Sequence, residues 1–404
     1  MNTSIRSMRF KILISCFLAM FFAGTLYSWS IFVPSFEEEF GWARSQTSLT
    51  YSLMISFNTG LGVLSAFLSR KLSFRSLIRV GAGMGLAGLL LVANVQSLWQ
   101  LYLGFGILFG GGMGFVYNSC CASIVRWFPD NPGGYSGVLL MAYGFATMVL
   151  GPLYNAGIEQ FGWRRLFLLL AVVCAVLLTG CSMFNRMPAA GEERLLPKPR
   201  LRGGSGGERS LAPREMLRTP QFWMYSVWQI LLAACGMTLS GHAAPLAQEA
   251  GASAALAAFF VGLQSGGSGV GRVLFGFIFD RIGRKTLYLV NAFPIAGSLL
   301  LLLSYRQGLI PLMAAAFLLL GIGFGGSPVS SAGYTKYTFG PLYYAMNLSI
   351  VNLSVLVASF AGPYIGGLVY EKSGYGMVCV MMLVFALLGV CAAVPTVRSK
   401  GIND

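Results

Sequence analysis

The sequence predicts an all-α membrane protein with twelve transmembrane helices in two six-helix, pseudo-symmetric halves. Of its 404 residues, 56% are hydrophobic and only 10% are charged, and the mean hydropathy is +0.70. This composition lies far outside the range of soluble globular proteins. Apolar runs of about 20 residues, long enough to cross a ~30 Å hydrocarbon core, recur along the chain. The 52 glycines fit this class, because small residues let membrane helices approach closely.

The first apolar run follows three basic residues, as the core of a signal peptide would. It is too long for one and lacks a clear small-residue cleavage site, so we interpret it as the first of twelve spans. The predicted spans are 10–35, 47–69, 76–95, 100–125, 133–157, 165–184, 221–245, 254–279, 286–305, 309–333, 340–367 and 375–397.

Lysine and arginine are concentrated in alternate connections between these spans. The positive-inside rule then places both termini in the cytoplasm and predicts a multi-pass protein of the cell inner membrane. The net charge of +15 reflects this topology, so we expect membrane lipid around the protein and no nucleic-acid partner. We also expect a monomer.

Residues 185–220 are rich in Pro, Gly, Ser and charge and show no apolar face, which predicts a cytoplasmic linker. This linker would separate an N-terminal six-helix bundle, residues 1–184, from a C-terminal one, residues 221–404. Similar residues recur in the two halves at an offset of 210 or 211. The pairs are Pro34 with Pro245, Gly110 with Gly321, Arg126 with Lys336, and Gly151-Pro152 with Gly362-Pro363. Transporters built from such repeats bind substrate near the membrane midplane.

One full charge, Arg272, lies inside an apolar span, where an ionisable side chain is expensive and is a functional candidate. A helical wheel places it on a face of glycine and serine, opposite Val270 and Phe277. No carboxylate falls within a predicted span, so the guanidinium suits the carboxylate of a substrate, which it can bind with two parallel hydrogen bonds. Alternatively, because Asp280 lies about 12 Å further along the helix, the Arg272 side chain could extend toward the membrane surface.

The stretch from Gly276 to Lys285 reads GFIFDRIGRK. It resembles the loop motif of the major facilitator superfamily, G-x-x-x-D-R-x-G-[RK]-[RK], at every defined position. The corresponding loop of the first half, 66–75, is degenerate, with Arg70 where the motif has Asp. We interpret the motif as a conformational latch that pairs in one state and releases in another; anchoring the topology would need only the cations. The latch residues are Gly276, Asp280, Arg281, Gly283, Arg284 and Lys285.

Within that superfamily the chain resembles the bacterial oxalate:formate antiporter and monocarboxylate transporter group. The residues that carry this resemblance are 27–32 (YSWSIF), 39–42 (EFGW), 126–130 (RWFPD) and the lone Arg272. The resemblance implies a secondary active transporter that works by alternating access, without enzymatic activity or a cofactor. It also implies that Arg272 binds the carboxylate of the substrate.

The oxalate carriers of that group have a lysine on helix eleven, where this sequence has Asn352. One cation suits one carboxylate, so we predict a small monocarboxylate such as lactate or pyruvate. Asn352 would donate to a second substrate oxygen, or would only bond to a neighbouring helix. An oxalate/formate-type anion exchanger and a transporter-like carboxylate sensor remain alternatives.

Aromatic and amide side chains are predicted to line the rest of the cavity. The candidates are Tyr27, Tyr117, Asn118 and Tyr143. Matching tyrosines close over the substrate in the group, although a tyrosine in a membrane helix also serves packing or the interface. The single histidine, His242, is either a proton relay or an interfacial residue.

Coupling is left open by the sequence. Proton symporters often carry an acidic residue within the membrane, and none is predicted here. A proton could still travel with the substrate, so antiport, uniport and proton symport all remain possible modes of transport. No phosphate-binding loop is present to suggest ATP-driven transport. The eight cysteines fall in apolar segments and predict neither disulfides nor a metal site.

Overall fold

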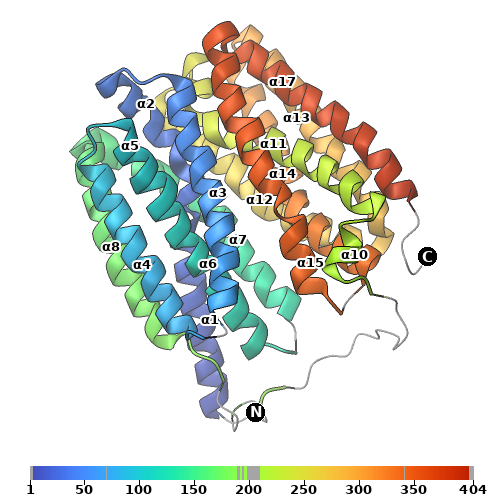
Figure 1. Cartoon of the computed structure of the whole chain (residues 1–404). Helices are drawn as coiled ribbons and strands as arrows, with labels where there is room; N and C mark the ends of the chain where they lie inside the picture. The colour runs from blue at the N-terminus through green and yellow to red at the C-terminus, as the bar shows by residue number, and fades with distance from the viewer. Residues whose placement is uncertain are drawn as a thin grey trace. The chain divides into compact units, whose positions relative to one another are not determined.

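The computed structural model describes residues 3–69, 71–130, 132–188, 192, 195–197, 210–340 and 342–399. Within these residues every secondary-structure element is a helix (Figure 1). Ten apolar helical stretches are long enough to cross a membrane, and two of them, Ala254–Gln307 and Met346–Arg398, each cover two of the predicted spans. The part of the chain that the structure describes therefore contains the twelve spans that the sequence predicts.

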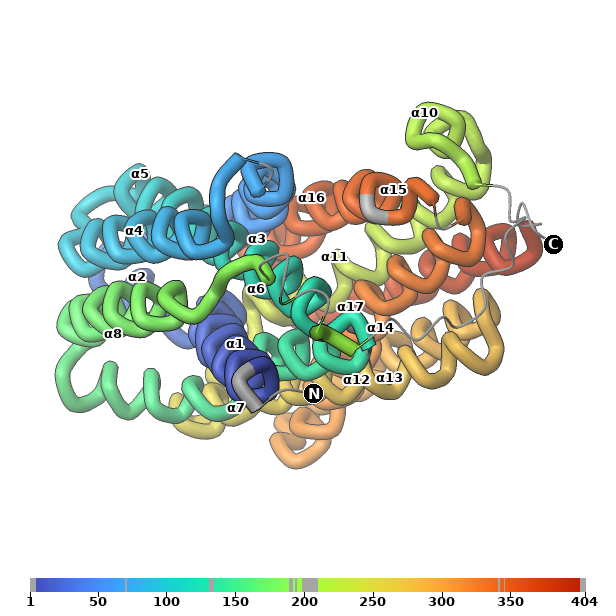
Figure 2. The backbone as a smooth tube through the Cα atoms, turned by 90° about the horizontal axis from the view of Figure 1, so that it is seen from below, coloured from blue at the N-terminus to red at the C-terminus, as the bar shows by residue number. Residues whose placement is uncertain are grey.

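The helices group into two compact units by their contacts. The first unit comprises Met1–Leu26, Leu53–Ala146 and Leu153–Gly203. Its helix α4 packs against both α6 and α8, and Figure 2 shows α4 beside α8. The helices that lie wholly or partly in this unit are α1 (Thr3–Ala23), α3 (Arg44–Leu68), α4 (Phe74–Ala93), α5 (Leu98–Leu101), the π-helix η2 (Tyr102–Phe109), α6 (Gly110–Trp127), α7 (Pro132–Phe161) and α8 (Trp163–Phe184).

The second unit comprises Tyr27–Ser52, Thr147–Pro152 and Gly204–Asp404. It therefore includes short stretches from the first six spans. A 3₁₀ helix, η1 (Gly24–Ser28), interrupts the first span between α1 and α2. The other helices of this unit are α2 (Trp29–Phe40), α10 (Pro213–Met216), α11 (Pro220–Glu249), α12 (Ala254–Ile282), η3 (Gly283–Lys285), α13 (Thr286–Gln307), α14 (Ile310–Phe339), α15 (Tyr344–Val351), α16 (Ser354–Ser359), the π-helix η4 (Phe360–Tyr364) and α17 (Ile365–Arg398).

Local sequence signals set several of these boundaries. Ser253 caps α12 by accepting a hydrogen bond from the Leu256 amide, and Thr219 caps α11, where Pro220 occupies the first helical position. Gly308 ends α13 in the left-handed conformation that glycine adopts without strain. Within α17, Gly374 has φ 70°, and this residue separates the last two spans.

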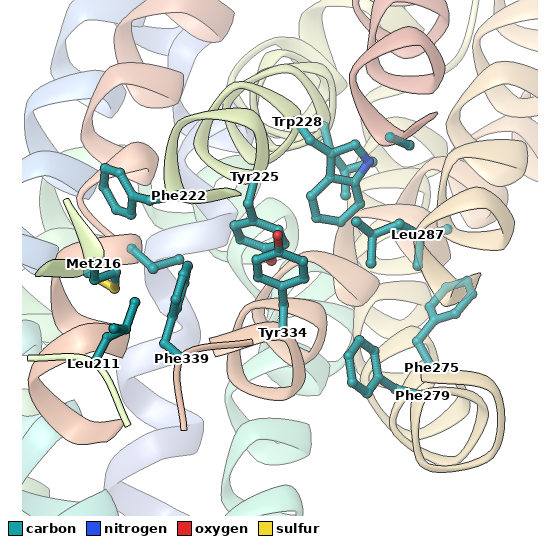
Figure 3. Close-up of a cluster of buried hydrophobic side chains, with 14 residues drawn as sticks. Leu211, Met216, Phe222, Tyr225, Trp228, Phe275, Phe279, Leu287, Tyr334 and Phe339 are labelled. Carbon is teal, nitrogen blue, oxygen red and sulfur yellow. The ribbon is translucent and has the colours of Figure 1, made fainter. Parts of the chain in front are cut away.

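The end of the expected linker is part of the core of the second unit, which corrects the prediction that residues 185–220 have no apolar face. Leu211 and Met216 are buried (8% and 0% exposed) in the cluster shown in Figure 3. The amide of Leu211 donates to the Phe339 carbonyl, and Asn347 Nδ2 donates to the Leu211 carbonyl, both at 3.0 Å. Residues 189–191, 193–194 and 198–209 of this linker lie outside the described residues.

Two tyrosines occupy the middle of the same core. The rings of Tyr225 on α11 and Tyr334 on α14 stack with centroids 4.2 Å apart (Figure 3). The Tyr225 hydroxyl is fully buried and meets Ser331 Oγ at 3.0 Å, which satisfies its polar group. Stacking and hydrogen bonding together fix α11 against α14.

Helices α12 and α14 approach each other closely because glycines lie at their crossing. A Cβ atom on Gly321 would meet the backbone oxygen of Gln264, and one on Gly325 would meet that of Ser268. The glycines are four residues apart and so share one face of α14. Small residues at this spacing let membrane helices pack backbone to backbone.

The first unit contains the same crossing between α3 and α6. A Cβ atom on Gly110 would meet the backbone oxygen of Met54, and one on Gly114 would meet that of Asn58. These glycines precede those of α14 by 211 residues, and their partners precede Gln264 and Ser268 by 210. The internal repeat that was inferred from sequence thus corresponds to a repeated backbone contact.

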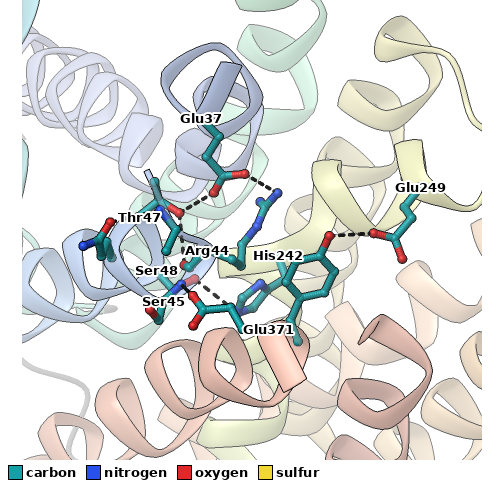
Figure 4. Close-up of polar contacts among 11 residues, drawn as sticks. Glu37, Arg44, Ser45, Thr47, Ser48, His242, Glu249 and Glu371 are labelled. Atoms are coloured by element: carbon teal, nitrogen blue, oxygen red, sulfur yellow. Dashed lines mark hydrogen bonds and ion pairs between the residues drawn. The ribbon is translucent and has the colours of Figure 1, made fainter. Parts of the chain in front are cut away.

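Polar side chains connect residues 37–48 to the rest of the second unit (Figure 4). Arg44 pairs with Glu37 at 2.5 Å, and these side chains are only 9% and 18% exposed. Thr47 Oγ1 donates to the same carboxylate at 2.6 Å. The amide of Ser45 donates to Glu371 of α17 at 2.7 Å. The segment between the first two spans is thus held together by the contacts of Glu37, and the charge-assisted bond from Ser45 to Glu371 connects it to α17.

Gly325→Ala is predicted to lower the free energy of unfolding by about 1–3 kcal/mol, because the new methyl group would force the α12 and α14 backbones apart. The measurement is thermal unfolding of the purified protein in detergent, followed by tryptophan fluorescence. Gly180→Ala on α8 is the matched control, since no atom lies within 4 Å of a Cβ built there. Equal stability of the two variants would contradict the close crossing.

Arg44→Gln is predicted to destabilise the protein by about 2 kcal/mol or more, because it leaves the partly buried Glu37 carboxylate without its cation. The same unfolding assay measures the effect. The double variant Glu37→Gln/Arg44→Gln should recover part of the loss, since neither charge is then left alone. If the losses of stability measured for Arg44→Gln and for Glu37→Gln simply add in the double variant, the ion pair contributes nothing to stability.

Candidate functional site

Arg272 lies on α12, which has the two faces that the sequence predicts. Val270, Leu274 and Phe277 are exposed at the outer surface (47%, 38% and 68%). On the other face Ser265 and Ser268 are buried, and Arg272 itself is half-buried. The guanidinium is thus carried on a helix whose apolar side is the one suited to lipid.

A small cavity adjoins this inner face. Its accessible volume is about 10 Å³, the space of roughly one water molecule. Tyr27, which the sequence analysis proposed for the site, lines the cavity and meets Phe324 edge-on with ring centroids 6.4 Å apart. The full lining is Tyr27, Ser240, Val261, Gln264, Ser265, Ser268 and Phe324.

Gln264 is fixed in this cavity wall. Its Nε2 donates to the Gly236 carbonyl at 3.0 Å and to Ser240 Oγ at 2.8 Å, so both amide hydrogens are used. Neither Gln264 nor Ser240 was predicted from sequence to belong to the site. The available signal was a polar residue two helical turns before Arg272 in an otherwise small or apolar run.

Asn352 lies where the eleventh span is interrupted between α15 and α16. The amides of Leu353 and Val355 donate to carbonyls three residues earlier, as in a tightened turn, instead of four. The Asn352 Oδ1 accepts a long hydrogen bond of 3.5 Å from Gln229 of α11. This is a contact between helices, the alternative role that was considered for Asn352.

The other residues that were predicted from sequence to bind substrate lie in the first unit. The rings of Tyr117 on α6 and Tyr143 on α7 meet edge-on with centroids 5.4 Å apart. Asn118 Nδ2 lies 3.5 Å from the Gly114 carbonyl, one turn back on α6. The structure therefore brings Tyr117 and Tyr143 together within the first unit, and Asn118 follows Tyr117 in the sequence. Tyr27, Arg272 and Asn352 lie in the second unit.

The motif from Gly276 to Lys285 forms the end of α12 and the turn into α13. Gly283 ends the helix with φ 57°, and its amide donates to the Phe279 carbonyl. Arg284 donates to the Ser399 carbonyl and lies over the ring of Tyr337, 5.4 Å from its centroid. Arg284 therefore connects this turn to the ends of α14 and α17.

The other charges of the motif face outward. Asp280, Arg281 and Lys285 are exposed, and Gly276 is half-buried beside Val329. No ion pair of Asp280 occurs within the described part of the chain. Arg70, the residue that replaces Asp in the first-half loop, lies outside the described residues.

His242 is buried inside the second unit and is not at an exposed interface. It is 0% exposed, and its Nε2 lies 2.8 Å from the Pro363 carbonyl and 3.4 Å from Ser48 Oγ. Figure 4 shows it beside the Arg44 network. Of the two roles considered for it, the interfacial one is wrong; the proton-relay role stays a hypothesis.

Comparisons with known proteins agree with this architecture. The chain matches a family model described as Major Facilitator Superfamily over residues 12–296 and 230–402. It is 25% identical to the oxalate:formate antiporter of Oxalobacter formigenes over 401 residues, which cover 97% of this chain and 92% of the relative. It is 24% identical to monocarboxylate transporter 11 of Mus musculus over 371 residues, 87% of this chain and 78% of the relative.

Solved structures show the same fold. A D-xylose-proton symporter aligns with a TM-score of 0.75 at 16% identity, covering 97% of this chain and 99% of that one. An inward-facing bacterial homolog of the human lysosomal transporter Spinster aligns with a TM-score of 0.73 at 15% identity, covering 97% of both chains. The chain therefore belongs to the Major Facilitator Superfamily, as a multi-pass membrane transporter related to the oxalate:formate antiporter and the monocarboxylate transporters, and it is not an enzyme.

Proposed function

We propose that this protein is a secondary transporter of a small monocarboxylate, such as lactate or pyruvate, that works by alternating access. The observation that carries the proposal is Arg272, a half-buried guanidinium on the small, polar face of α12, one helical turn from a cavity lined by Ser268 and Tyr27. A guanidinium binds a planar carboxylate with two parallel hydrogen bonds. The similarity to monocarboxylate transporters supports the substrate class.

The preference for one carboxylate rests on Asn352. The resemblance implies that oxalate carriers have a second cation at this position, and an amide cannot neutralise a second carboxylate. The proposed binding residues are accordingly Arg272, Asn352 and Tyr27, together with Tyr117, Asn118 and Tyr143 of the first unit on the resemblance alone. The motif residues Gly276, Asp280, Arg281, Gly283, Arg284 and Lys285 are proposed as a conformational latch.

The membrane placement is part of the same proposal. Basic residues are concentrated in the connections that would share a side with the N-terminus, which supports cytoplasmic termini and insertion in the inner membrane. The side that carries Glu37 and Arg44 would then face outward.

Exchange of formate is the second candidate function, and one observation favours it. The oxalate:formate antiporter is similar over nearly the whole chain. Formate is a monocarboxylate, so a single cation at Arg272 suits it as well. Counterflow distinguishes the two: an exchanger takes up labelled anion only when the vesicles are loaded with a partner anion.

Arg272→Gln is predicted to lower kcat/KM for lactate uptake into proteoliposomes by about 100-fold or more, since a bidentate, charge-assisted contact is lost. Arg306→Gln, at the exposed end of α13, is the matched control and should transport normally. Both variants must be reconstituted in equal amounts. Normal uptake by Arg272→Gln would refute the substrate role of Arg272.

Asn352→Lys is predicted to make oxalate a competitor, because a second cation would then face the second carboxylate of the dianion. The measurement is the concentration of oxalate that halves lactate uptake, which should fall by about tenfold or more. Asn352→Gln, which adds length without charge, is the control. If oxalate inhibits the lysine and glutamine variants equally, Asn352 does not face the substrate.

A further inference from the structure

Ser268 is a buried hydroxyl that the proposed function has not yet used. It is 5% exposed, and its Oγ has no hydrogen-bond partner among the described residues. Buried serines and threonines in membrane helices usually bond to the carbonyl four residues earlier. Thr238, Ser240 and Ser331 do so here at 2.7–3.1 Å. Ser268 does not, and an unpaired buried hydroxyl is unfavourable. Several other buried hydroxyls of the described residues also lack a partner, and Ser268 is distinguished from them because it lines the cavity.

Gln264 presents a second polar atom to the same cavity. Its two amide hydrogens are held by Gly236 and Ser240, which fixes the orientation of the side chain. Within the part of the chain that the structure describes, no hydrogen bond is made to its Oε1. Among the polar groups of the cavity wall are therefore the hydroxyl of Ser268 and one fixed carbonyl acceptor, from Gln264.

These two groups are aligned with Arg272. Gln264, Ser268 and Arg272 follow one another at intervals of four residues, so they share one face of α12 at steps of about 6 Å. Side chains on a helix tilt toward its N-terminus. The Cα–Cβ bond of Arg272 consequently points toward the turn that carries Ser268.

We propose that Ser268 and Gln264 form a subsite, beside Arg272, for the 2-hydroxyl group of a 2-hydroxy monocarboxylate. This inference rests on the proposed function and specifies its substrate class. A hydroxyl both donates and accepts, so it would donate to Gln264 Oε1 and accept from Ser268 Oγ. A 2-oxo group accepts only and would use Ser268 alone, while a plain alkyl acid would use neither.

The size of the cavity fits such a group. Its accessible volume of about 10 Å³ holds one small polar group and no second carboxylate. The 2-hydroxyl is bonded to the carbon next to the carboxylate, so it lies close to whatever binds the carboxylate. A guanidinium that extends toward Ser268 meets this requirement. The predicted order of affinity is L-lactate, then pyruvate, then propionate, three acids of nearly equal size.

The test is competition of the three unlabelled acids against labelled L-lactate in proteoliposomes. The wild-type protein should prefer L-lactate to propionate by about tenfold or more, the effect of one or two hydrogen bonds. In Ser268→Ala, the preference of the transporter for lactate over propionate, and for pyruvate over propionate, should fall to within about twofold. Gln264→Met should abolish only the preference of lactate over pyruvate. The matched control is Ser304→Ala, a buried serine on α13 that bonds to the Leu301 carbonyl at 2.9 Å.

Three results would overturn the subsite. An unchanged order of preference in Ser268→Ala means that the hydroxyl does not contact the substrate, as when a trapped water occupies the cavity. An equal loss for all three acids means that Ser268 only packs. Absence of labelled L-lactate uptake by the wild-type protein, both into empty vesicles and into vesicles loaded with unlabelled lactate, rejects the monocarboxylate function itself, and the subsite with it. In the first two cases the wild-type protein still takes up lactate, so the subsite alone is rejected.

Discussion

A positive charge carried within an apolar helix is the constraint on which the second unit depends. A guanidinium at membrane depth is stable only when it faces protein or a ligand. Helix α12 meets this requirement with one face of serine and glycine turned inward and another of valine, leucine and phenylalanine exposed. The same small residues let α14 approach backbone to backbone, so that the packing of the unit and the placement of Arg272 have one cause.

The repeated crossing shows how one fold is specialised. Both units bring two helices together over glycines at an offset of 211 residues. The helix face behind each crossing differs between the units. It carries Met54, Asn58 and Gly62 in the first unit and Gln264, Ser268 and Arg272 in the second. The backbone arrangement is shared, and the charge occurs in one copy only, which is why we propose carboxylate recognition on α12.

Hydropathy and charge sufficed to predict the class, the number of spans and most boundaries, because burying a backbone in lipid requires helices of a set length. The rarity of charge within spans was enough to single out Arg272. Features that depend on tertiary packing could not be predicted from hydropathy and charge. The interruption at Asn352, the burial of Leu211 and Met216, and the burial of His242 depend on neighbours distant in sequence. Gln264 and Ser268 were overlooked as site residues because uncharged polar residues are common in helix packing.

Uptake of labelled L-lactate by the wild-type protein in proteoliposomes, with excess pyruvate or oxalate outside, tests the central account most directly. One guanidinium for one carboxylate predicts uptake that pyruvate suppresses and oxalate leaves nearly unchanged. Repeating it with and without an inward proton gradient identifies the coupling. Uptake that oxalate suppresses more strongly than pyruvate would contradict the account, because a dianion would then be the better ligand for a site with a single cation.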